Sequence, residues 1–484
     1  MRKSFVQYPF HPFLFSIIPV LILFADNIAE IPAQQIISPL VVVTLLATGL
    51  LVSVNLIIKD INISGLIVSP FILLFLSYSK LFDFISNYTR GTKWHLISVC
   101  VFSLLILMLY SLYYYKLLKA KHSRKIVNII KVFNGVALLL ILFNLIQIGL
   151  FKLNEPRNNV VDINKISVRA EKSGLTPDIY YIILDGYASL SEMRAVFNYD
   201  NTAFANYLIK KGFYIAHKSK SKFISTDQSL ATSLNMEVLG NPESEAGRSS
   251  VSLSFGSSLN LDVSKEEIYY YKKIRQNKVV GMLKSMGYKY IHFGAWWYGT
   301  RYNKHADINF NCHGFRTKNE FNAILIQSSV LRLLYLDWEF HRRGVLYAFE
   351  ELARVVNIPG PKFIFAHIIC PHGPYVFGQN GEKVGRKDNG KYSEKFLYIN
   401  QYIFISKRIE KLVDEILSKS EKAPIIIIQS DHGSRLDKAY TNNIFNAYYL
   451  PNNGTKFLNE SISPENTFRV IFNHYFNEKY DLIE

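Results

Sequence analysis

Residues 1–151 consist of long apolar segments separated by short polar stretches. Four of the five segments approach or reach the ~20 residues that an α-helix needs to cross a bilayer, and the first is shorter. The first segment has the character of a signal peptide, but no small-residue cleavage site follows it before the next segment. The pattern therefore predicts a membrane anchor of five helical spans, at residues 13–25, 36–58, 61–78, 96–114 and 132–151.

Basic residues are distributed unevenly among the loops of this anchor. Arg2 and Lys3 precede the first span, whereas the loop at 26–35 has neither lysine nor arginine. The loop between the third and fourth spans carries fewer basic residues than the loop between the fourth and fifth, which holds Lys116, Lys119, Lys121, Arg124, Lys125 and Lys131. Because basic loops stay in the cytoplasm, we expect a cytoplasmic N-terminus, and five spans then deliver everything after residue 151 outside.

After a polar linker at 152–176, apolar strand-like runs alternate with helical periods as far as residue 484. This alternation predicts one extracytoplasmic α/β domain at 177–484 with a mostly parallel central sheet. The expected helices lie at 201–211, 274–286, 395–420 and 465–476, and further strands at 212–216, 288–294 and 446–450.

Three apolar runs of this domain end in side chains that bind metals. The run PIIIIQSDHGSR at 424–435 leads into Asp431 and His432, PDIYYIILDGYAS at 177–189 leads into Asp185, and KFIFAHIICPHGPY at 362–375 carries His367 and His372. Buried parallel strands read as such continuous apolar runs, and their carboxyl ends share one edge of the sheet. Carboxylate and imidazole ligands without thiolate favour one site for Zn²⁺, Mn²⁺ or Mg²⁺.

The composition limits the classes of function. The chain is 49% hydrophobic, its mean hydropathy is +0.10 and its net charge is +17, which fits contact with anionic lipid or phosphorylated substrates. The basic residues are dispersed and no nucleic-acid-reading motif accompanies them, so we disfavour nucleic acid. Cys100 lies in an apolar segment, whereas the sequence permits one disulfide between Cys312 and Cys370.

A hydroxyl-rich turn supplies a candidate nucleophile. The segment FISTDQSLATSLNM at 223–236 is typical of a turn entering a helix, with Thr226 at its start. Positive potential at a helix N-terminus and coordination to a divalent cation both lower the pKa of a hydroxyl. The competing interpretation is that Thr226 only caps the helix, and Ser225 and Ser229 are alternative nucleophiles.

Taken in order, LDGYAS, Thr226 ahead of SLATSLNM, HIICPHGPY and SDHG resemble the alkaline phosphatase and sulfatase superfamily. The closest likeness is to its membrane branch of lipoteichoic acid synthases and lipid A phosphoethanolamine transferases. The resemblance implies an α/β/α alkaline-phosphatase-like domain. It also implies that Thr226 is the covalently substituted nucleophile and a metal ligand, beside the ligands Asp185, Asp431 and His432. His367 and His372 fall on the segment that lines the substrate phosphate, although His367 also fits a hydrogen-bonded core histidine.

Two departures from these relatives narrow the expectation. After SDHG the chain continues SRLDKAYTNN, without the acidic and histidine positions that some transferases use, so we expect one divalent metal ion. Those transferases also tend to carry several disulfides, which two extracytoplasmic cysteines cannot supply. Separately, the formylglycine signature of ordinary sulfatases is missing near Thr226, which argues against an ordinary sulfatase. The aromatic and basic segment 294–307 suggests a headgroup pocket with Trp297 and Arg301 as substrate-binding residues, against the alternative that its aromatic side chains only pack.

These features predict a bacterial inner-membrane, metal-dependent phosphotransferase with a periplasmic catalytic domain. It would move phosphoglycerol or phosphoethanolamine from a phospholipid donor to an envelope glycan or lipid acceptor through a covalent Thr226 intermediate. One alternative is a sulfatase-like hydrolase of phosphate, phosphonate or sulfate esters. A second is a non-catalytic protein that binds an envelope partner.

Overall fold

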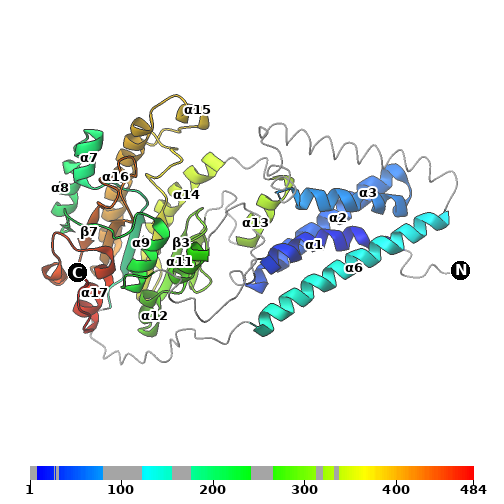
Figure 1. Ribbon diagram of the computed structural model, residues 1–484, viewed down its shortest axis with the longest axis horizontal. Coiled ribbons are helices and arrows are strands. Elements are labelled where there is room, and N and C mark those ends of the chain that lie inside the picture. Colours follow the sequence, from blue (N-terminus) through cyan, green and yellow to red (C-terminus); the bar gives the residue numbers. More distant parts are fainter. Residues whose placement is uncertain are drawn as a thin grey trace. The chain divides into compact units, whose positions relative to one another are not determined.

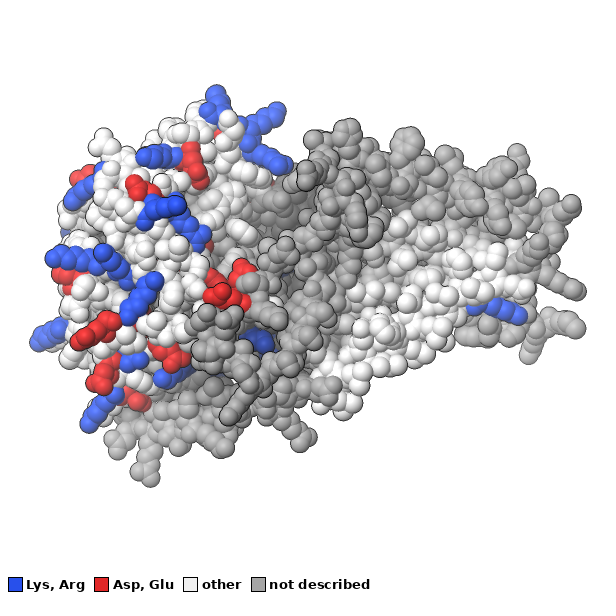
Figure 2. Space-filling model, viewed as in Figure 1, with Lys and Arg blue, Asp and Glu red and all other residues white. Residues whose placement is uncertain are grey.

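The computed structural model describes residues 8–26, 28, 32–79, 123–154, 176–240, 265–311, 320–331 and 337–484. They form two compact units. The described residues up to 154, together with 320–331, make a helical unit, and the remaining described residues make a sheet unit. On the face drawn in Figure 2, the described charged side chains gather over the sheet unit, and the described part of the helical unit is almost entirely white.

The helical unit contains four of the expected apolar segments as helices (Figure 1). Two stretches among the described residues, Ala33–Ile58 and Ile126–Phe151, are long and apolar enough to cross a membrane. The other two helices are apolar but shorter, and the expected span at 96–114 lies outside the described residues. The bounds are α1 His11–Asp26, η2 Ala33–Ile36, α2 Ile37–Ile58, α3 Ile61–Leu76 and α6 Ser123–Asn154.

Helix α13 (Glu320–Ser328) follows the fourth strand in the chain but packs in the helical unit. Phe321 is fully buried, its ring lies 6.4 Å from that of Phe24, and its amide donates to Gln35 Oε1. Ser328 Oγ lies 3.3 Å from the carbonyl oxygen of Leu76. These contacts fall at the end of α1, just before α2 and at the end of α3, which the predicted topology places on one side of the membrane.

The sheet unit is built on a seven-stranded sheet in the order β2-β7-β6-β1-β5-β3-β4. Neighbouring strands from β6 to β4 pair in parallel, and β7 is antiparallel to both β6 and β2. The mostly parallel sheet follows the sequence expectation except at this edge. The bounds are β1 Ile179–Leu184, β2 Tyr214–Ile215, β3 Lys289–Gly294, β4 Ile308–Asn311, β5 Lys362–Ile368, β6 Ile425–Ser430 and β7 Asn446–Tyr449.

Alternate residues of the central strand β1 enter two different hydrophobic clusters, because successive side chains of a strand point to opposite faces. Tyr180, Ile182 and Leu184 pack with residues of α7, α8, α14 and α16, whereas Ile179 and Tyr181 pack with residues of α9, α11, α12 and α17. The unit is therefore an α/β/α sandwich. The helices are α7 Leu190–Phe197, α8 Thr202–Lys210, α9 Thr226–Asn235, α11 Lys265–Arg275, α12 Lys278–Ser285, α14 Asp337–Leu352, η5 Val355–Asn357, α15 Arg386–Asn389, α16 Glu394–Lys419, η6 Gly454–Phe457 and α17 Pro464–Phe476.

The register of the sheet places the candidate ligands side by side. Leu184 of β1 pairs with Ser430 of β6 and with Ile368 of β5. Asp185 and Asp431 are the next residues of their strands, so both carboxylates leave the sheet at the carboxyl edge.

Candidate metal centre and nucleophile

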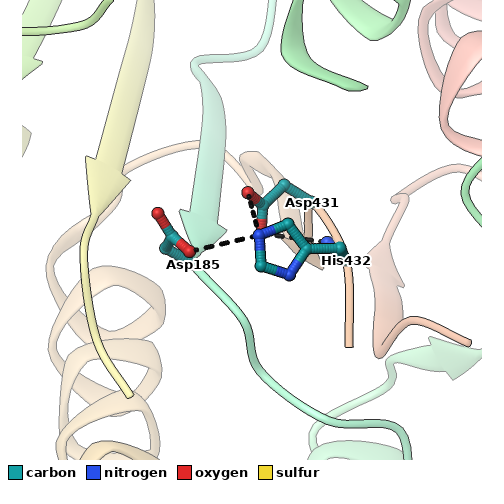
Figure 3. A group of neighbouring side chains, drawn as sticks. All are labelled: Asp185, Asp431 and His432. Carbon is teal, nitrogen blue, oxygen red and sulfur yellow. Dashed lines mark hydrogen bonds and ion pairs between the residues drawn. The ribbon is translucent and has the colours of Figure 1, made fainter. Parts of the chain in front are cut away.

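Asp185, Asp431 and His432 converge at this edge of the sheet (Figure 3). One ligand atom from each lies within 4.8 Å of the others, and all three side chains are buried. His432 Nε2 is 3.3 Å from Asp431 Oδ2 and 3.5 Å from Asp185 Oδ1. Two carboxylates without solvent carry a large electrostatic cost unless a cation compensates them.

One oxygen of each candidate carboxylate ligand accepts no hydrogen bond from the described residues. Asp431 Oδ1 accepts from the amides of Gly186 and His432, at 3.0 and 2.9 Å. Asp431 Oδ2 and Asp185 Oδ1 are buried and have no hydrogen-bond donor among the described residues. Burial alone would raise the pKa of Asp185, but the neighbouring imidazoles of His367, His372 and His432 hold that pKa below its ordinary value.

The tautomer of His432 indicates that its Nε2 is available to bind a metal ion. Its Nδ1 is 2.7 Å from the carbonyl oxygen of Gly433, which can only accept, so Nδ1 carries the proton. Nε2 of a neutral ring is then an acceptor aimed at two carboxylates. A metal-binding histidine has this arrangement, with the second nitrogen donating to a backbone carbonyl. The residues therefore fit a divalent metal ion.

Thr226 is the first residue of α9, and its Oγ1 lies 3.3 Å from His432 Nε2. The N-cap position is Ser225, so the interpretation of Thr226 as the helix cap is wrong. The hydroxyls of the alternative nucleophiles are engaged elsewhere. Ser225 Oγ donates to Gln228 Oε1, and Ser229 Oγ donates to the carbonyl oxygen of Asp431 at 2.8 Å.

His367 lies in β5 and is fully enclosed. Its Nδ1 is 2.8 Å from Thr300 Oγ1, and its Nε2 is 3.3 Å from Asp185 Oδ2, the carboxylate oxygen opposite the one that faces His432. His367 is thus both a hydrogen-bonded buried histidine and a residue of the site. In this arrangement His367 orients a candidate metal ligand.

His372 follows β5 and is half-buried. Its amide donates to the carbonyl oxygen of Asp185 at 3.1 Å, and its ring centre is 6.5 Å from that of His432. Since Nδ1 is 2.7 Å from the carbonyl oxygen of Gly373, that nitrogen donates, which leaves Nε2 for another partner. His372 is thus close enough to the candidate ligands to act on a group bound there.

The candidate substrate residues lie next to His367. The indole of Trp297 meets the imidazole of His367 edge-on, with ring centres 5.6 Å apart, and also packs against Tyr271. Arg301 is 7% exposed and follows Thr300, the hydrogen-bond partner of His367. Trp297 therefore contacts His367 and also packs against Tyr271, and Arg301 is linked to the site through its chain neighbour Thr300.

Cys370 is a free, fully buried thiol, and burial raises its pKa well above the ordinary value. The disulfide between Cys370 and Cys312 that the sequence permits is therefore not formed. Its other candidate residue, Cys312, lies outside the described residues.

Glu192 on α7 is a residue of the site that sequence reasoning missed. It is fully buried, and its Oε1 accepts from the amide of Ser434 at 3.1 Å and from the Ser434 hydroxyl at 2.5 Å. Ser434 lies two residues after His432, so Glu192 holds the loop that carries two candidate ligands. A glutamate in the first turn of a helix gives no sequence signal for this role, because acidic residues are ordinary there.

We expect Glu192→Gln to change how stability depends on pH. Burial raises the pKa of Glu192 from 4.5 to about 7, although its bonds to Ser434 lower it. The folded state therefore binds this proton more tightly than the unfolded state, and stability is lost as pH rises from about 4.5 to 7, by at most about 3 kcal/mol. In thermal unfolding of the metal-free protein, the melting temperature of the variant should rise relative to that of the wild type across this pH range. Above the range the difference should stay constant. Parallel curves would contradict the assignment.

We expect Gly433→Ala to destabilise the same loop. A Cβ there would lie 2.5 Å from Glu192 Oε2 and 2.7 Å from the carbonyl oxygen of Tyr440. Relief of such overpacking typically costs about 1–3 kcal/mol, and it would displace Asp431 and His432, so both melting temperature and metal affinity should fall. Gly281→Ala is the matched control, since its added Cβ meets nothing within 4 Å. Equal melting temperatures for the two variants would contradict the account.

No family model matches this sequence, and no curated protein matches it. Among solved structures, the chain is similar to the C-terminal periplasmic domain of EcEptC from Escherichia coli in complex with Zn, at 12% identity and a TM-score of 0.43 over 64% of this chain and 84% of that one. It is similar to the integral membrane protein lipooligosaccharide phosphoethanolamine transferase A (EptA) from Neisseria meningitidis, at 12% identity and a TM-score of 0.39 over 97% of this chain and 96% of that one.

A third similar structure is a protein of the alkaline phosphatase superfamily from Vibrio parahaemolyticus, with 11% identity and a TM-score of 0.39 over 63% of this chain and 67% of that one. Because every one of these TM-scores is below 0.5, the function proposed below rests on the geometry of the site.

Proposed function

We propose that the protein is a metal-dependent membrane phosphotransferase. It moves a phosphorylated alcohol, phosphoglycerol or phosphoethanolamine, from a phospholipid to an envelope glycan or lipid through a covalent intermediate on Thr226. The observation that carries the proposal is the convergence of the Thr226 hydroxyl, the acceptor nitrogen of His432 and two carboxylate oxygens without donors. Such a set fits one divalent cation that also contacts the nucleophile.

Asp185, Asp431, His432 and Thr226 would hold the cation, and the chemistry of these donors suits Zn²⁺, Mn²⁺ or Mg²⁺. When bound, the cation supplies a lowered pKa for the Thr226 hydroxyl and neutralises charge on the phosphate oxygens. The N-terminal amides of α9 create positive electrostatic potential around Thr226, which favours the binding of a phosphate there.

In the first half-reaction Thr226 Oγ1, having released its proton to solvent, attacks the phosphorus atom of a phosphodiester. An Oγ1–P bond forms as the bond from phosphorus to the diacylglycerol oxygen breaks. His372 is suited to protonate that oxygen from Nε2, because its Nδ1 proton is committed to the carbonyl oxygen of Gly373. In the second half-reaction His372 takes the proton of the acceptor hydroxyl, and the acceptor oxygen attacks phosphorus. The Oγ1–P bond breaks as the new bond forms, and Thr226 Oγ1 takes a proton back from solvent.

The membrane setting selects the donor class. The helical unit has two apolar helices of spanning length among the described residues, so phospholipid headgroups are the nearest abundant phosphodiesters. The catalytic domain would face the periplasm of a bacterial inner membrane, as the basic loops predict. Trp297 and Arg301 would contact the headgroup beside His367.

Acceptor dependence tests this proposal. The purified full chain is supplied with divalent metal and headgroup-labelled phospholipid, and label release to water is compared with label transfer after a glycan or lipid acceptor is added. A transferase gives little release alone and a large rise in turnover with acceptor. Fast release without acceptor would indicate the hydrolase alternative. A protein without stoichiometric metal or turnover would indicate the envelope-binding alternative.

A further inference from the structure

One buried face of α16 carries side chains that reach two loops at the site, the loop after β1 and the loop after β5. Tyr398, Gln401 and Tyr402 follow the spacing of one helix face, and all are buried. Tyr398 Oη accepts from the amide of Ala188 and donates to the carbonyl oxygen of Gly186, just after Asp185. Gln401 reaches the other loop, which follows β5 and contains His372.

Gln401 uses its whole hydrogen-bonding capacity on that loop. Its Nε2 donates to the carbonyl oxygens of Pro371 and His372, both at 3.1 Å. Its Oε1 accepts from the amides of Val376 and Phe377, at 2.8 and 3.2 Å. The backbone partners fix the orientation of the side-chain amide, because carbonyls only accept and amides only donate. One side chain thus bridges the two ends of the loop.

These bonds hold the backbone of His372 from two sides. Its amide donates to the carbonyl oxygen of Asp185, and its carbonyl oxygen accepts from Gln401. Gln401 is 0% exposed, so its loss would leave the loop's polar groups without a partner in the interior and drive the loop to rearrange. The imidazole of His372 would then move relative to Asp185 and His432.

We propose that Gln401 is a positioning residue that sets His372 against the candidate metal centre. The inference rests on the proposed function for its consequence in turnover, and on the loop geometry for its structural part. Displacement of an acid–base group by about 1 Å can cost on the order of 100-fold in rate.

Two variants test the role. Gln401→Glu keeps the acceptor for the amides of Val376 and Phe377 but has no donor, when ionised, for the carbonyls of Pro371 and His372. Gln401→Leu removes all four bonds at similar volume. The control is Tyr207→Phe, which removes a 2.8 Å bond to the carbonyl oxygen of Glu410, further along α16 and away from both loops.

The full chain is measured for turnover of a chromogenic aryl phosphodiester with a glycan or lipid acceptor present, for metal content and for hydrogen exchange of residues 372–377. Both Gln401 variants should lose about 10- to 100-fold in kcat with KM and metal content nearly unchanged. Exchange of these amides should rise about 10-fold or more in Gln401→Leu and stay at the wild-type rate in Tyr207→Phe. Equal losses of kcat in the Gln401 and Tyr207 variants, or unchanged exchange in Gln401→Leu, would overturn the inference. If the wild type has no activity, the proposed function fails, and the exchange data alone decide whether Gln401 holds the loop.

Discussion

Thr226→Ala should abolish turnover while the protein largely keeps its fold and its metal, which Asp185, Asp431 and His432 still hold. The account makes Thr226 Oγ1 the atom that bonds to phosphorus, and loss of a nucleophile typically lowers kcat by about 10³-fold or more. The fold should tolerate the change because Thr226 is inside the first turn of α9 and does not cap it, and alanine is a good helix former. Turnover of labelled phospholipid with acceptor, metal content and melting temperature give the three readouts.

Ser225→Ala is the matched control for this prediction. Ser225 is the neighbouring hydroxyl, but its Oγ donates to Gln228 Oε1 and makes no capping bond. We expect this variant to keep most of its turnover, and Thr226→Ser to keep a part because the hydroxyl remains. Full turnover in Thr226→Ala, or loss confined to Ser225→Ala, would rule out Thr226 as the nucleophile.

Asp431→Asn should lose the metal as well as turnover. The substitution removes one of two buried negative charges that face His432 Nε2, and with it much of the attraction for a divalent cation. The asparagine oxygen can still accept from the amides of Gly186 and His432, which puts its NH₂ group, a donor and not a metal ligand, in the place of Oδ2. Because changes even beyond the ligands cost 10–100-fold in metal affinity, we expect a loss of more than about 100-fold here.

Metal content after dialysis and the rise in melting temperature on adding metal measure this effect. The wild type should show stoichiometric metal and a clear rise, and Asp431→Asn should show neither. Asp437→Asn is the control, since Asp437 is an exposed carboxylate in the same loop whose Oδ1 accepts from the amide of Ala439. Retention of full metal affinity in Asp431→Asn would remove Asp431 from the ligand set.

The central strands and the candidate ligands were predictable from the sequence. Strands β1, β5 and β6 are buried on both faces, so they appear as unbroken apolar runs, and their polar termini fall at one edge of the sheet. The antiparallel edge was not predicted, because β2 has only two residues and carries too little pattern to indicate a direction.

The residues that support the ligands could not be predicted in the same way. Glu192 and Gln401 lie in amphipathic helices, where a polar residue is expected to face solvent, and only the tertiary contacts show that both are buried. The family resemblance places His367 on the segment that lines the substrate phosphate, whereas its side-chain nitrogens contact Asp185 and Thr300. Sequence patterns predict which residues reach the edge of the sheet, but the partners of each side chain depend on distant segments.

Intact-mass analysis tests the central claim most directly. The purified full chain and its Thr226→Ala variant are incubated with mixed membrane phospholipids and divalent metal, without acceptor. The intact mass of each protein is then measured by mass spectrometry. The account predicts a mass increment on the wild type that equals one phosphorylated alcohol and is missing from the variant. An equal increment on Thr226→Ala, or a wild type with neither an increment nor bound metal, would contradict a covalent intermediate on Thr226.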